Sequence, residues 1–457
     1  MVALIPLAAP MGGAEAATTA GGMQLWVSRY QGPWPGVDTG EDVAVSSDGA
    51  RVFVTGYSAG ASGDPDWATL AYDGATGATL WAARFNGQAD DIDAATALAI
   101  SPDDSLVFVT GHTETQDTGQ DYLTMAYDAA SGGVRWVKRY NGTGSLYQVP
   151  STIAVSPDGT KLFVTGYSIG SNDSNYATLA YDSTTGTPLW ARHYDGPGHG
   201  PDQPYGLGVS PDGSTVFVTG LSDFGPGERG DFVTLGYDVA TGRRDWISRY
   251  DGPASGDDFA YSLAVMPDGS SVFVTGTSQD ASGLTDYGTV AINAKRGAPF
   301  WVRRFDGSAG LTDYPTTVGI SPDGLLVFVT GFSTVVDGTY DVVTLAYDAT
   351  TGSTVWARRF NGPANGSDLP EDLAVSLDGS AVYVAGVTDV AGGDHDYLTL
   401  CYDAVTGEPL GVRRYDGPGD SADRALAVAV SDQDVYVTGY STGGDADLDY
   451  ATVAYAI

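Results

Sequence analysis

The sequence predicts an all-β fold, an eight-bladed β-propeller of four-stranded antiparallel blades. A phrase of the type "VFVTG" recurs eight times, about every 55 residues, and a fixed period of this length is typical of propeller repeats. Between these phrases, runs rich in β-branched and aromatic residues alternate with turn motifs, as short strands do. The phrase ends on the glycines Gly56, Gly111, Gly166, Gly220, Gly276, Gly331, Gly386 and Gly439.

Each repeat contains four strand-like runs, here named a to d from the propeller axis outward. Strand a resembles "DLAVS" (372–376) and leads through a "PDG"-type turn into strand b, the "VFVTG" run. A polar loop of variable sequence follows, and then strand c, such as "DYLTLCYD" (396–403). A "TTG"-type turn leads to strand d, such as "TVWARRF" (354–360). Helical periodicity is absent, which excludes a helical solenoid.

The two chain ends supply one blade between them. The last repeat ends on "DYATVAYAI" (449–457), a strand c without a following strand d, whereas "GMQLWVSRY" (22–30) is a strand d without a preceding strand c. A propeller with an open ring would expose unpaired strand edges. We therefore expect residues 22–30 to complete the eighth blade.

Acidic and basic residues 18 positions apart predict an ion pair within most blades. The sequence carries Asp66 and Arg84, Asp121 and Arg139, Asp231 and Arg249, Asp286 and Arg304, Asp341 and Arg359, and Asp396 and Arg414. In the remaining internal repeat both members change together, to Asn175 and His193. We expect each pair to lie opposite in the c–d hairpin, and by extension Asp449 to pair with Arg29.

Seven tryptophans share one position in strand d, where the eighth repeat has Gly411. They are Trp26, Trp81, Trp136, Trp190, Trp246, Trp301 and Trp356. Repetition of a large aromatic residue at one position around a ring indicates packing between neighbouring blades. A ligand site would not need the same residue in every blade.

The composition of the chain limits the binding partners and the cellular location that can be expected for the protein. The formal net charge is −36, from 57 acidic and 21 basic side chains, which disfavours nucleic acid and anionic membranes as partners. The single cysteine, Cys401, cannot form an internal disulfide and is expected to be buried. Residues 1–17 resemble the later part of a secretory signal without its basic start, with a disordered tail as the alternative. We expect a leader at 1–17, one propeller at 18–457, no membrane span, a monomer, and a secreted or cell-surface location.

A recurring motif adds a family resemblance. The pattern Ala-x-Asp-x-x-Thr-Gly-x-x-x-Trp occurs at 71–81, 180–190 and 346–356. It resembles the tryptophan-docking repeat of the quinoprotein alcohol dehydrogenase-like (PQQ-like) eight-bladed propellers, and the "SPDG…VFVTG" portion is similar to bacterial extracellular SBBP-like and YVTN-like propeller repeats. Dehydrogenases of this kind imply pyrroloquinoline quinone (PQQ), a calcium ion, a catalytic aspartate and often a vicinal cysteine pair. With one cysteine and no long insertions, this chain is not expected to hold PQQ.

The longer d–a and b–c loops should share one face, here called the long-loop face, because the a–b and c–d turns are short. An acid recurs in the d–a loop at Asp38, Asp93, Asp202, Asp258, Asp313, Asp368 and Asp423, with Gln148 as the exception. These carboxylates could bind a cation such as Ca²⁺, with Asp93, Asp202, Asp258, Asp313 and Asp368 as candidate ligands. The favoured interpretation is that each acid accepts backbone N–H groups of its own loop.

Other positions in these loops differ from blade to blade, as a single asymmetric site requires. Tyr147, Tyr205, Phe259, Tyr261 and Tyr314 should line one sector of the rim, with Glu41, Glu371 and Arg424 on the other side. The aromatic rings either bind a neutral sugar or an extended peptide, or fill the axial channel as core. Both interpretations remain open at this point.

Two function classes follow. The first is a secreted, non-enzymatic propeller that binds a carbohydrate, peptide or protein on its long-loop face. The alternative is an enzyme with its site at the channel mouth, either a quinoprotein-like dehydrogenase or a propeller-type polysaccharide lyase. A hydrolase triad, a zinc site or a phosphate-binding loop is not evident in the sequence.

Overall fold

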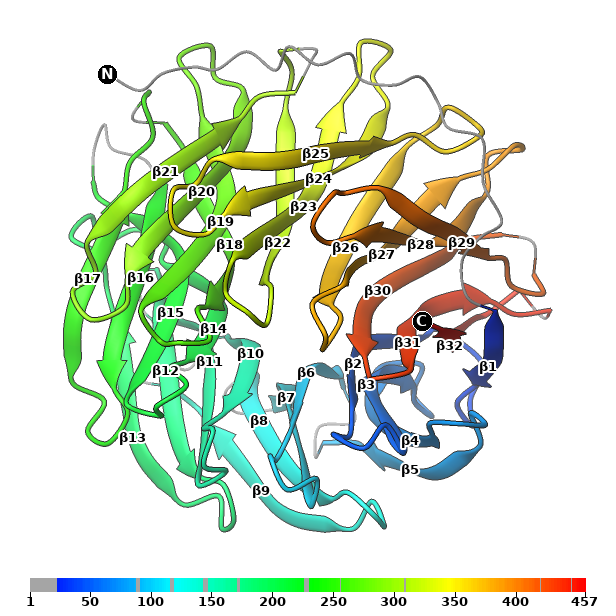
Figure 1. Cartoon of the computed structure of the whole chain (residues 1–457). Coiled ribbons are helices and arrows are strands. Elements are labelled where there is room, and N and C mark those ends of the chain that lie inside the picture. Colours follow the sequence, from blue (N-terminus) through cyan, green and yellow to red (C-terminus); the bar gives the residue numbers. More distant parts are fainter. Residues whose placement is uncertain are drawn as a thin grey trace.

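The computed structural model describes residues 23–457 except 88–90, 116–118, 143–146, 171–172, 226–229, 255, 308–309, 420 and 445. Within these residues, four-stranded antiparallel sheets form eight blades around a common axis, with the first strand of each repeat innermost (Figure 1). No helix long and apolar enough to cross a membrane occurs in this part of the chain. The predicted leader at 1–17 lies outside the described residues.

The strands of the first four blades follow one another along the chain. Blade 1 contains β2 (Asp38–Val45), β3 (Arg51–Ala59), β4 (Pro65–Asp73) and β5 (Thr79–Phe85). Blade 2 contains β6 (Asp93–Ile100), β7 (Leu106–Thr115), β8 (Gly119–Asp128) and β9 (Val134–Tyr140). Blade 3 contains β10 (Gln148–Val155), β11 (Lys161–Ile169), β12 (Ser174–Asp182) and β13 (Pro188–Tyr194). Blade 4 contains β14 (Gln203–Val209), β15 (Thr215–Asp223), β16 (Gly230–Asp238) and β17 (Arg244–Tyr250).

The remaining blades repeat this order until the ring closes. Blade 5 contains β18 (Asp258–Val265), β19 (Ser271–Gln279), β20 (Thr285–Asn293) and β21 (Pro299–Phe305). Blade 6 contains β22 (Asp313–Ile320), β23 (Leu326–Thr334), β24 (Tyr340–Asp348) and β25 (Thr354–Phe360). Blade 7 contains β26 (Asp368–Val375), β27 (Ala381–Asp389), β28 (His395–Asp403) and β29 (Pro409–Tyr415). Blade 8 contains β30 (Asp423–Val430), β31 (Asp434–Thr442), β32 (Leu448–Ala456) and β1 (Gln24–Tyr30).

Blade 8 joins the two ends of the chain. Its strand order is β1-β32-β31-β30, and β1 lies beside β32 in Figure 1. Arg29 Nη2 lies 2.9 Å from Asp449 Oδ2 across this pair. The predicted closure of the ring by the N-terminal strand is confirmed.

The predicted ion pairs form in seven blades of the described chain, but their register differs from the prediction. Arg84 lies opposite Ala68, two residues along β4 from Asp66. A bulge between Ala71 and Tyr72 shifts the register, so the pair is diagonal and the long arginine side chain spans the offset, with 3.0 Å between Arg84 Nη2 and Asp66 Oδ2. The same contact joins Asp121 to Arg139, Asp231 to Arg249, Asp286 to Arg304, Asp341 to Arg359, Asp396 to Arg414 and Asp449 to Arg29.

The tryptophans pack between blades, as predicted. Trp301 of β21 is 7% exposed, and its Nε1 donates to the Ala349 carbonyl of blade 6 at 3.0 Å. Its ring lies against Gly352, whose φ is +68° and where a Cβ would come within 2.7 Å of the indole. A glycine in this turn is therefore required both for the left-handed backbone and for the space.

Gly411 departs from this pattern for a structural reason. In blade 8 the strands that correspond to c and d, β32 and β1, come from opposite ends of the chain. Within the described residues no turn joins them, so a tryptophan at 411 would have no turn glycine to pack against. Arg413, two residues later on β29, instead places its guanidinium over the Tyr455 ring of β32.

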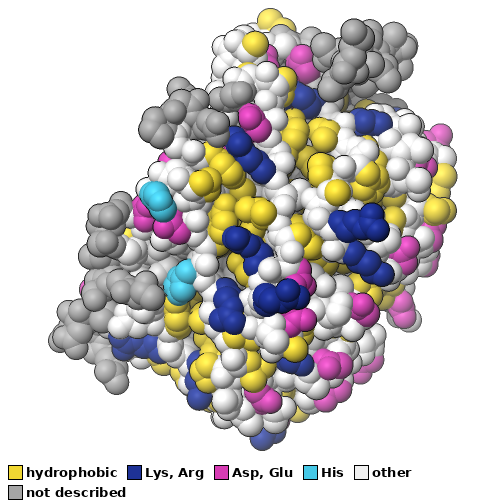
Figure 2. Space-filling view, turned by 90° about the vertical axis from the view of Figure 1, so that its left-hand side faces the viewer, with side chains coloured by type: hydrophobic (Ala, Val, Ile, Leu, Met, Phe, Trp, Pro, Cys, Tyr) yellow, Lys and Arg dark blue, Asp and Glu magenta, His cyan; other side chains and the backbone are white. Residues whose placement is uncertain are grey.

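The outermost strands carry many of the basic residues of this acidic chain. Figure 2 shows Lys and Arg side chains among apolar ones on the side of the molecule where β13, β17 and β21 form the blade edges. Arg303 is typical: its Nε donates to Gly352 O and its Nη2 to Thr351 O, both at 2.6 Å, in the next blade. Charged side chains on open strand edges also oppose edge-to-edge association.

Cys401 is buried in the core between blades 7 and 8, as predicted.

Candidate functional site

Each innermost strand contains a β-bulge at the same point, near the long-loop face. In β18, Ala260 pairs with Gly276 and Ser262 with Thr275, so Tyr261 is the extra residue. A bulge leaves one residue outside the regular pairing and changes the direction of its side chain. The residues at this position are Glu41, Thr96, Ser151, Tyr205, Tyr261, Thr316, Glu371 and Leu426.

The glycine of the recurring "VFVTG" phrase makes this bulge possible. Gly331 of β23 lies opposite Pro315, the residue before the bulge. A Cβ at Gly331 would lie 2.1 Å from the Tyr314 carbonyl oxygen, which no side chain can occupy without moving the backbone. The glycines of the other seven repeats meet the corresponding carbonyl at similar distances. The bulge therefore explains why every copy of the "VFVTG" phrase ends on glycine.

Five aromatic rings form a continuous series across blades 4, 5 and 6, here called the aromatic sector. Tyr205 and Tyr261, the bulge residues of neighbouring blades, have ring centroids 5.9 Å apart. Tyr261 stacks with Tyr314 at 6.0 Å, and Tyr314 stacks with Phe332 at 5.4 Å. Phe332 and Tyr340 make a T-shaped contact, with ring centroids 4.9 Å apart. Three of the five predicted rim aromatics therefore belong to one contiguous surface.

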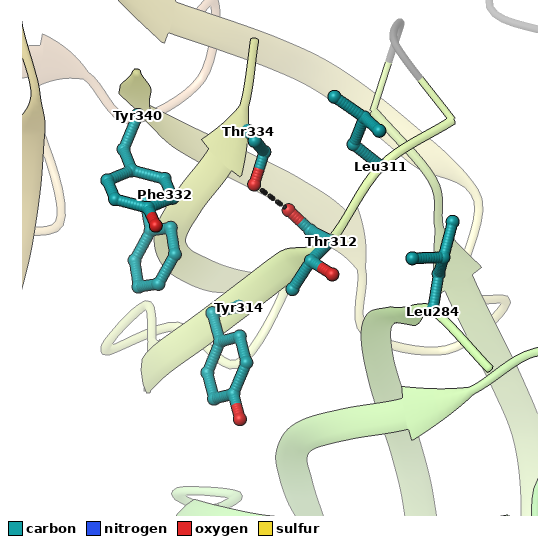
Figure 3. Close-up of a pocket in the computed structure, with 7 residues that line it drawn as sticks. All are labelled: Leu284, Leu311, Thr312, Tyr314, Phe332, Thr334 and Tyr340. Atoms are coloured by element: carbon teal, nitrogen blue, oxygen red, sulfur yellow. Dashed lines mark hydrogen bonds between the residues drawn. The ribbon is translucent and has the colours of Figure 1, made fainter. Parts of the chain in front are cut away.

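The outer end of the aromatic sector opens into a pocket of about 340 Å³. Loops of two blades build it (Figure 3): Leu284 comes from the β19–β20 loop, Leu311 and Thr312 precede β22, and Tyr340 begins β24. Tyr314, Phe332 and Thr334 complete the lining. A largely apolar concave surface with a few polar groups is the usual form of a ligand site.

The opposite part of the mouth is charged, and Glu41, Glu371 and Arg424 are here called the charged sector. Arg424 Nε donates to Glu371 Oε1 at 2.9 Å, which joins blades 7 and 8. Burial and the nearby Glu371 raise the pKa of Glu41, in blade 1, to about 7. Two glutamate carboxyls thus lie near one guanidinium, and ionisation of Glu41 as the pH rises through about 7 gives the sector an excess of negative charge.

Asp42 and Asp372 follow the bulge glutamates and were not singled out from the sequence. Asp42 Oδ2 accepts the Leu98 N–H of blade 2 at 2.8 Å, and Asp372 Oδ2 accepts the Val428 N–H of blade 8 at 3.0 Å. Burial raises the pKa of Asp42 to about 7 and that of Asp372 to about 6. These carboxyls join neighbouring blades next to the charged sector.

The recurring loop acids are buried. Asp313, for example, is 1% exposed, and its Oδ2 accepts the Gly307 N–H at 2.6 Å. Burial raises its pKa to about 6. The same contact with the glycine six residues earlier occurs at Asp38, Asp93, Asp202, Asp258, Asp368 and Asp423. This geometry supports the loop-stabilising interpretation.

Two of the predicted calcium ligands also lie in groups of carboxylates. Asp258 lies with Asp231 and Asp251, and in the next blade Asp313 lies with Asp286 and Asp306, the ligand atoms of each group being within 4.8 Å of one another. The arginines of the recurring hairpin pairs already neutralise Asp231 and Asp286. Calcium binding by Asp93, Asp202, Asp258, Asp313 and Asp368 stays a prediction.

The two remaining rim aromatics lie outside the aromatic sector. Tyr147 is 49% exposed at the start of blade 3, where its backbone forms an isolated parallel β-bridge with Gln120. Phe259 packs over Gly230 of blade 4, where a Cβ would lie 2.9 Å from its ring. Sequence reasoning missed Phe332 and Tyr340, although Phe332 directly follows the repeat glycine, a position that also holds Tyr57, His112 and Thr277 in other blades.

Comparison with known proteins identifies the family. A family model described as outer membrane protein assembly factor BamB (PQQ_2) matches residues 70–378, more than half of the chain. The chain belongs to this BamB-like family. The expected resemblance to PQQ-like eight-bladed propellers is therefore confirmed. No curated protein sequence matches the BamB-like chain.

Solved structures share the fold at low identity. Sqt1 from Chaetomium thermophilum, bound to the N-terminus of the ribosomal protein L10, is 13% identical with a TM-score of 0.62, covering 95% of this BamB-like chain and 100% of that chain. Quinohemoprotein alcohol dehydrogenase from Comamonas testosteroni is 14% identical with a TM-score of 0.56, covering 95% and 76%. These likenesses show the propeller fold.

The described mouth of this BamB-like propeller does not fit PQQ. The quinone carries three carboxylates and needs cationic partners. Arg424 is already paired with Glu371, and the adjacent Glu41 adds a further acidic group. An anionic cofactor in this position would meet an excess of negative charge.

Proposed function

We infer that the protein is a binding module that recognises an extended carbohydrate, peptide or protein partner on its long-loop face, outside the cytoplasm. The observation that carries this proposal is the aromatic sector: five rings from three neighbouring blades are in unbroken contact and end in a pocket. Blade packing does not require these rings, because other blades have Ala94, Val149 or Leu369 at the position of Tyr314.

The comparisons support a binding role and an extracytoplasmic location. The family description names an outer membrane protein assembly factor, and the solved Sqt1 structure holds the N-terminus of another protein. The signal-like leader at residues 1–17 agrees with export. A propeller that recruits a partner through one face is consistent with each of these features.

The aromatic sector offers a sharp test. The double variant Tyr261→Ser and Tyr314→Ala takes the residues that other blades carry at the same positions, Ser151 and Ala94, so the fold should tolerate it. Labelled wild-type protein and variant are applied to a glycan array and to a random-peptide array. We expect ligands on at least one array that bind the wild type and not the variant.

A matched control lies on the opposite face. Leu325 is 64% exposed in the turn between β22 and β23, and Leu325→Ser should retain every ligand. Ligands that bind equally well to the double variant, or the lack of any ligand on both arrays, would contradict the proposed function.

A further inference from the structure

We propose that the ligand of the long-loop face is a peptide segment that combines an apolar side chain, inserted in the pocket between blades 5 and 6, with a cationic side chain held by Glu41 and Glu371. This inference rests on the proposed function and selects one ligand class from it.

The pocket suits an apolar side chain better than a sugar. Leu284, Leu311 and the rings of Phe332 and Tyr340 are four of its seven lining residues. The Thr334 hydroxyl, one of the few polar groups, donates to the Thr312 carbonyl (Figure 3). Sugar hydroxyls need several convergent polar partners, whereas a volume of about 340 Å³ is near the lower limit for ligand pockets. One large aliphatic or aromatic side chain fits these conditions.

The geometry of the rings also favours a peptide over a sugar. Sugars bind proteins by stacking on an aromatic face, but Tyr314 stacks with Tyr261 at an interplanar angle of 18° and with Phe332 at 6°. Both stacking contacts use the faces of Tyr314, the central ring of the sector. Two hydroxyls of the sector also have partners: Tyr205 donates to Gln203 Oε1 at 2.7 Å, and the Tyr261 hydroxyl lies 3.2 Å from Thr277 Oγ1. The sector therefore offers apolar ring edges for a peptide to pack against.

Charge complementarity selects a cationic peptide. Glu41 and Glu371 lie near a single guanidinium, that of Arg424, and Asp42 and Asp372 are the next residues in β2 and β26. Many of the 21 basic side chains lie on the outer strands, away from the mouth. A lysine, arginine or terminal amine of the ligand would balance the excess carboxylate, and the net charge of −36 would speed its approach.

Isothermal titration calorimetry with four probes tests the assignment. The probes are a capped nonapeptide that alternates lysine and leucine, the same peptide with glutamate for lysine, the same peptide with serine for leucine, and maltoheptaose. We expect the first probe to bind at least tenfold more tightly than each of the others. We also expect Tyr314→Ala and Glu41→Gln each to weaken it at least fivefold, with Leu325→Ser as the unaffected control and circular dichroism spectra that show each variant to be folded.

Each alternative result has a defined meaning. Equal affinity of the lysine–serine peptide would show binding by charge alone and overturn the role of the pocket. Tighter binding of maltoheptaose that depends on Tyr314 would overturn the peptide assignment while leaving the proposed binding face intact. No detectable binding of the lysine–leucine peptide would overturn the inference, and the array experiment above would then decide the proposed function independently.

Discussion

Arg29 and Asp449 lie at opposite ends of the chain and form an ion pair with 2.9 Å between Nη2 and Oδ2. Arg29 also donates to the Ser441 side chain at 2.6 Å and to the Ser441 carbonyl at 2.8 Å. One side chain therefore connects β1 to both β32 and β31. The Asp449 side chain is only 9% exposed, so it depends on this partner.

Arg29→Met should lower the free energy of unfolding by about 1–3 kcal/mol, because it leaves the mostly buried Asp449 carboxylate without its charged donor. Urea denaturation followed by tryptophan fluorescence measures this change. Arg296→Met, at an exposed turn position, should change stability by less than about 0.5 kcal/mol. Equal midpoints for wild type and Arg29→Met would contradict the role of this pair in closing the ring.

Gly331→Ala should destabilise the protein by about 1–3 kcal/mol or more, as other substitutions that overfill a packed site do. The new methyl group would overlap the Tyr314 carbonyl, 2.1 Å away, and the bulge in β22 would have to rearrange. Gly170→Ala is the matched control, because a Cβ there meets no atom within 4 Å. If both variants unfold at the same denaturant concentration, the bulge does not require glycine.

Trp301→Ala should cost about 3–5 kcal/mol, the range for removing a large buried aromatic side chain. The substitution removes the indole between blades 5 and 6 and the hydrogen bond to the Ala349 carbonyl. Trp34→Ala, whose side chain is 48% exposed in a blade 1 loop, should leave stability nearly unchanged. Similar thermal melting of the two variants would refute the inter-blade role of Trp301.

Stability should fall as pH rises from about 4 to about 7. Burial raises the pKa of Glu41 and Asp42 to about 7 and that of Asp372 to about 6, whereas the unfolded chain titrates these groups near pH 4. In this interval the folded state holds more protons than the unfolded state, so the free energy of unfolding decreases with pH. Melting temperatures at pH 5 and pH 8 measure the effect.

Asp42→Asn should reduce this pH dependence, since the amide oxygen can still accept the Leu98 N–H and carries no charge at any pH. Asp432→Asn, at an exposed turn position between β30 and β31, should leave the change of melting temperature with pH as it is in the wild type. A flat profile for the wild type, or an unchanged slope in Asp42→Asn, would show that these carboxyls do not titrate as inferred.

The fold could be predicted from this sequence because the repeats serve as internal comparisons. Aligned copies gave the blade count, the pairing of β1 with β32, and the ion pair of Asp449 with Arg29. They did not reveal the diagonal register of Asp66 and Arg84, because a bulge of one residue changes which residues lie opposite and leaves the spacing in the chain unchanged.

The site was less predictable because it depends on contacts between blades. Variation around the mouth singled out Tyr205, Tyr261 and Tyr314, whose rings are in contact, and also Glu371 and Arg424, which form an ion pair. Leu284 and Tyr340 were missed, since they enter the pocket from loops of different blades. The corresponding segments of the two repeats, 279–286 and 334–341, carry different residues, Leu284 beside Thr339 and Thr285 beside Tyr340, so the sequence repeat did not mark either one.

The eight bulges also have an evolutionary consequence. Gly331 and its counterparts preserve the backbone geometry, while the bulge position itself holds glutamate, threonine, serine, tyrosine or leucine in different blades. Duplication of one repeat therefore copies a tolerant position together with the glycine that supports it. A substitution at one bulge position therefore changes the chemistry of the mouth in a single blade, while the blades keep a common sequence pattern.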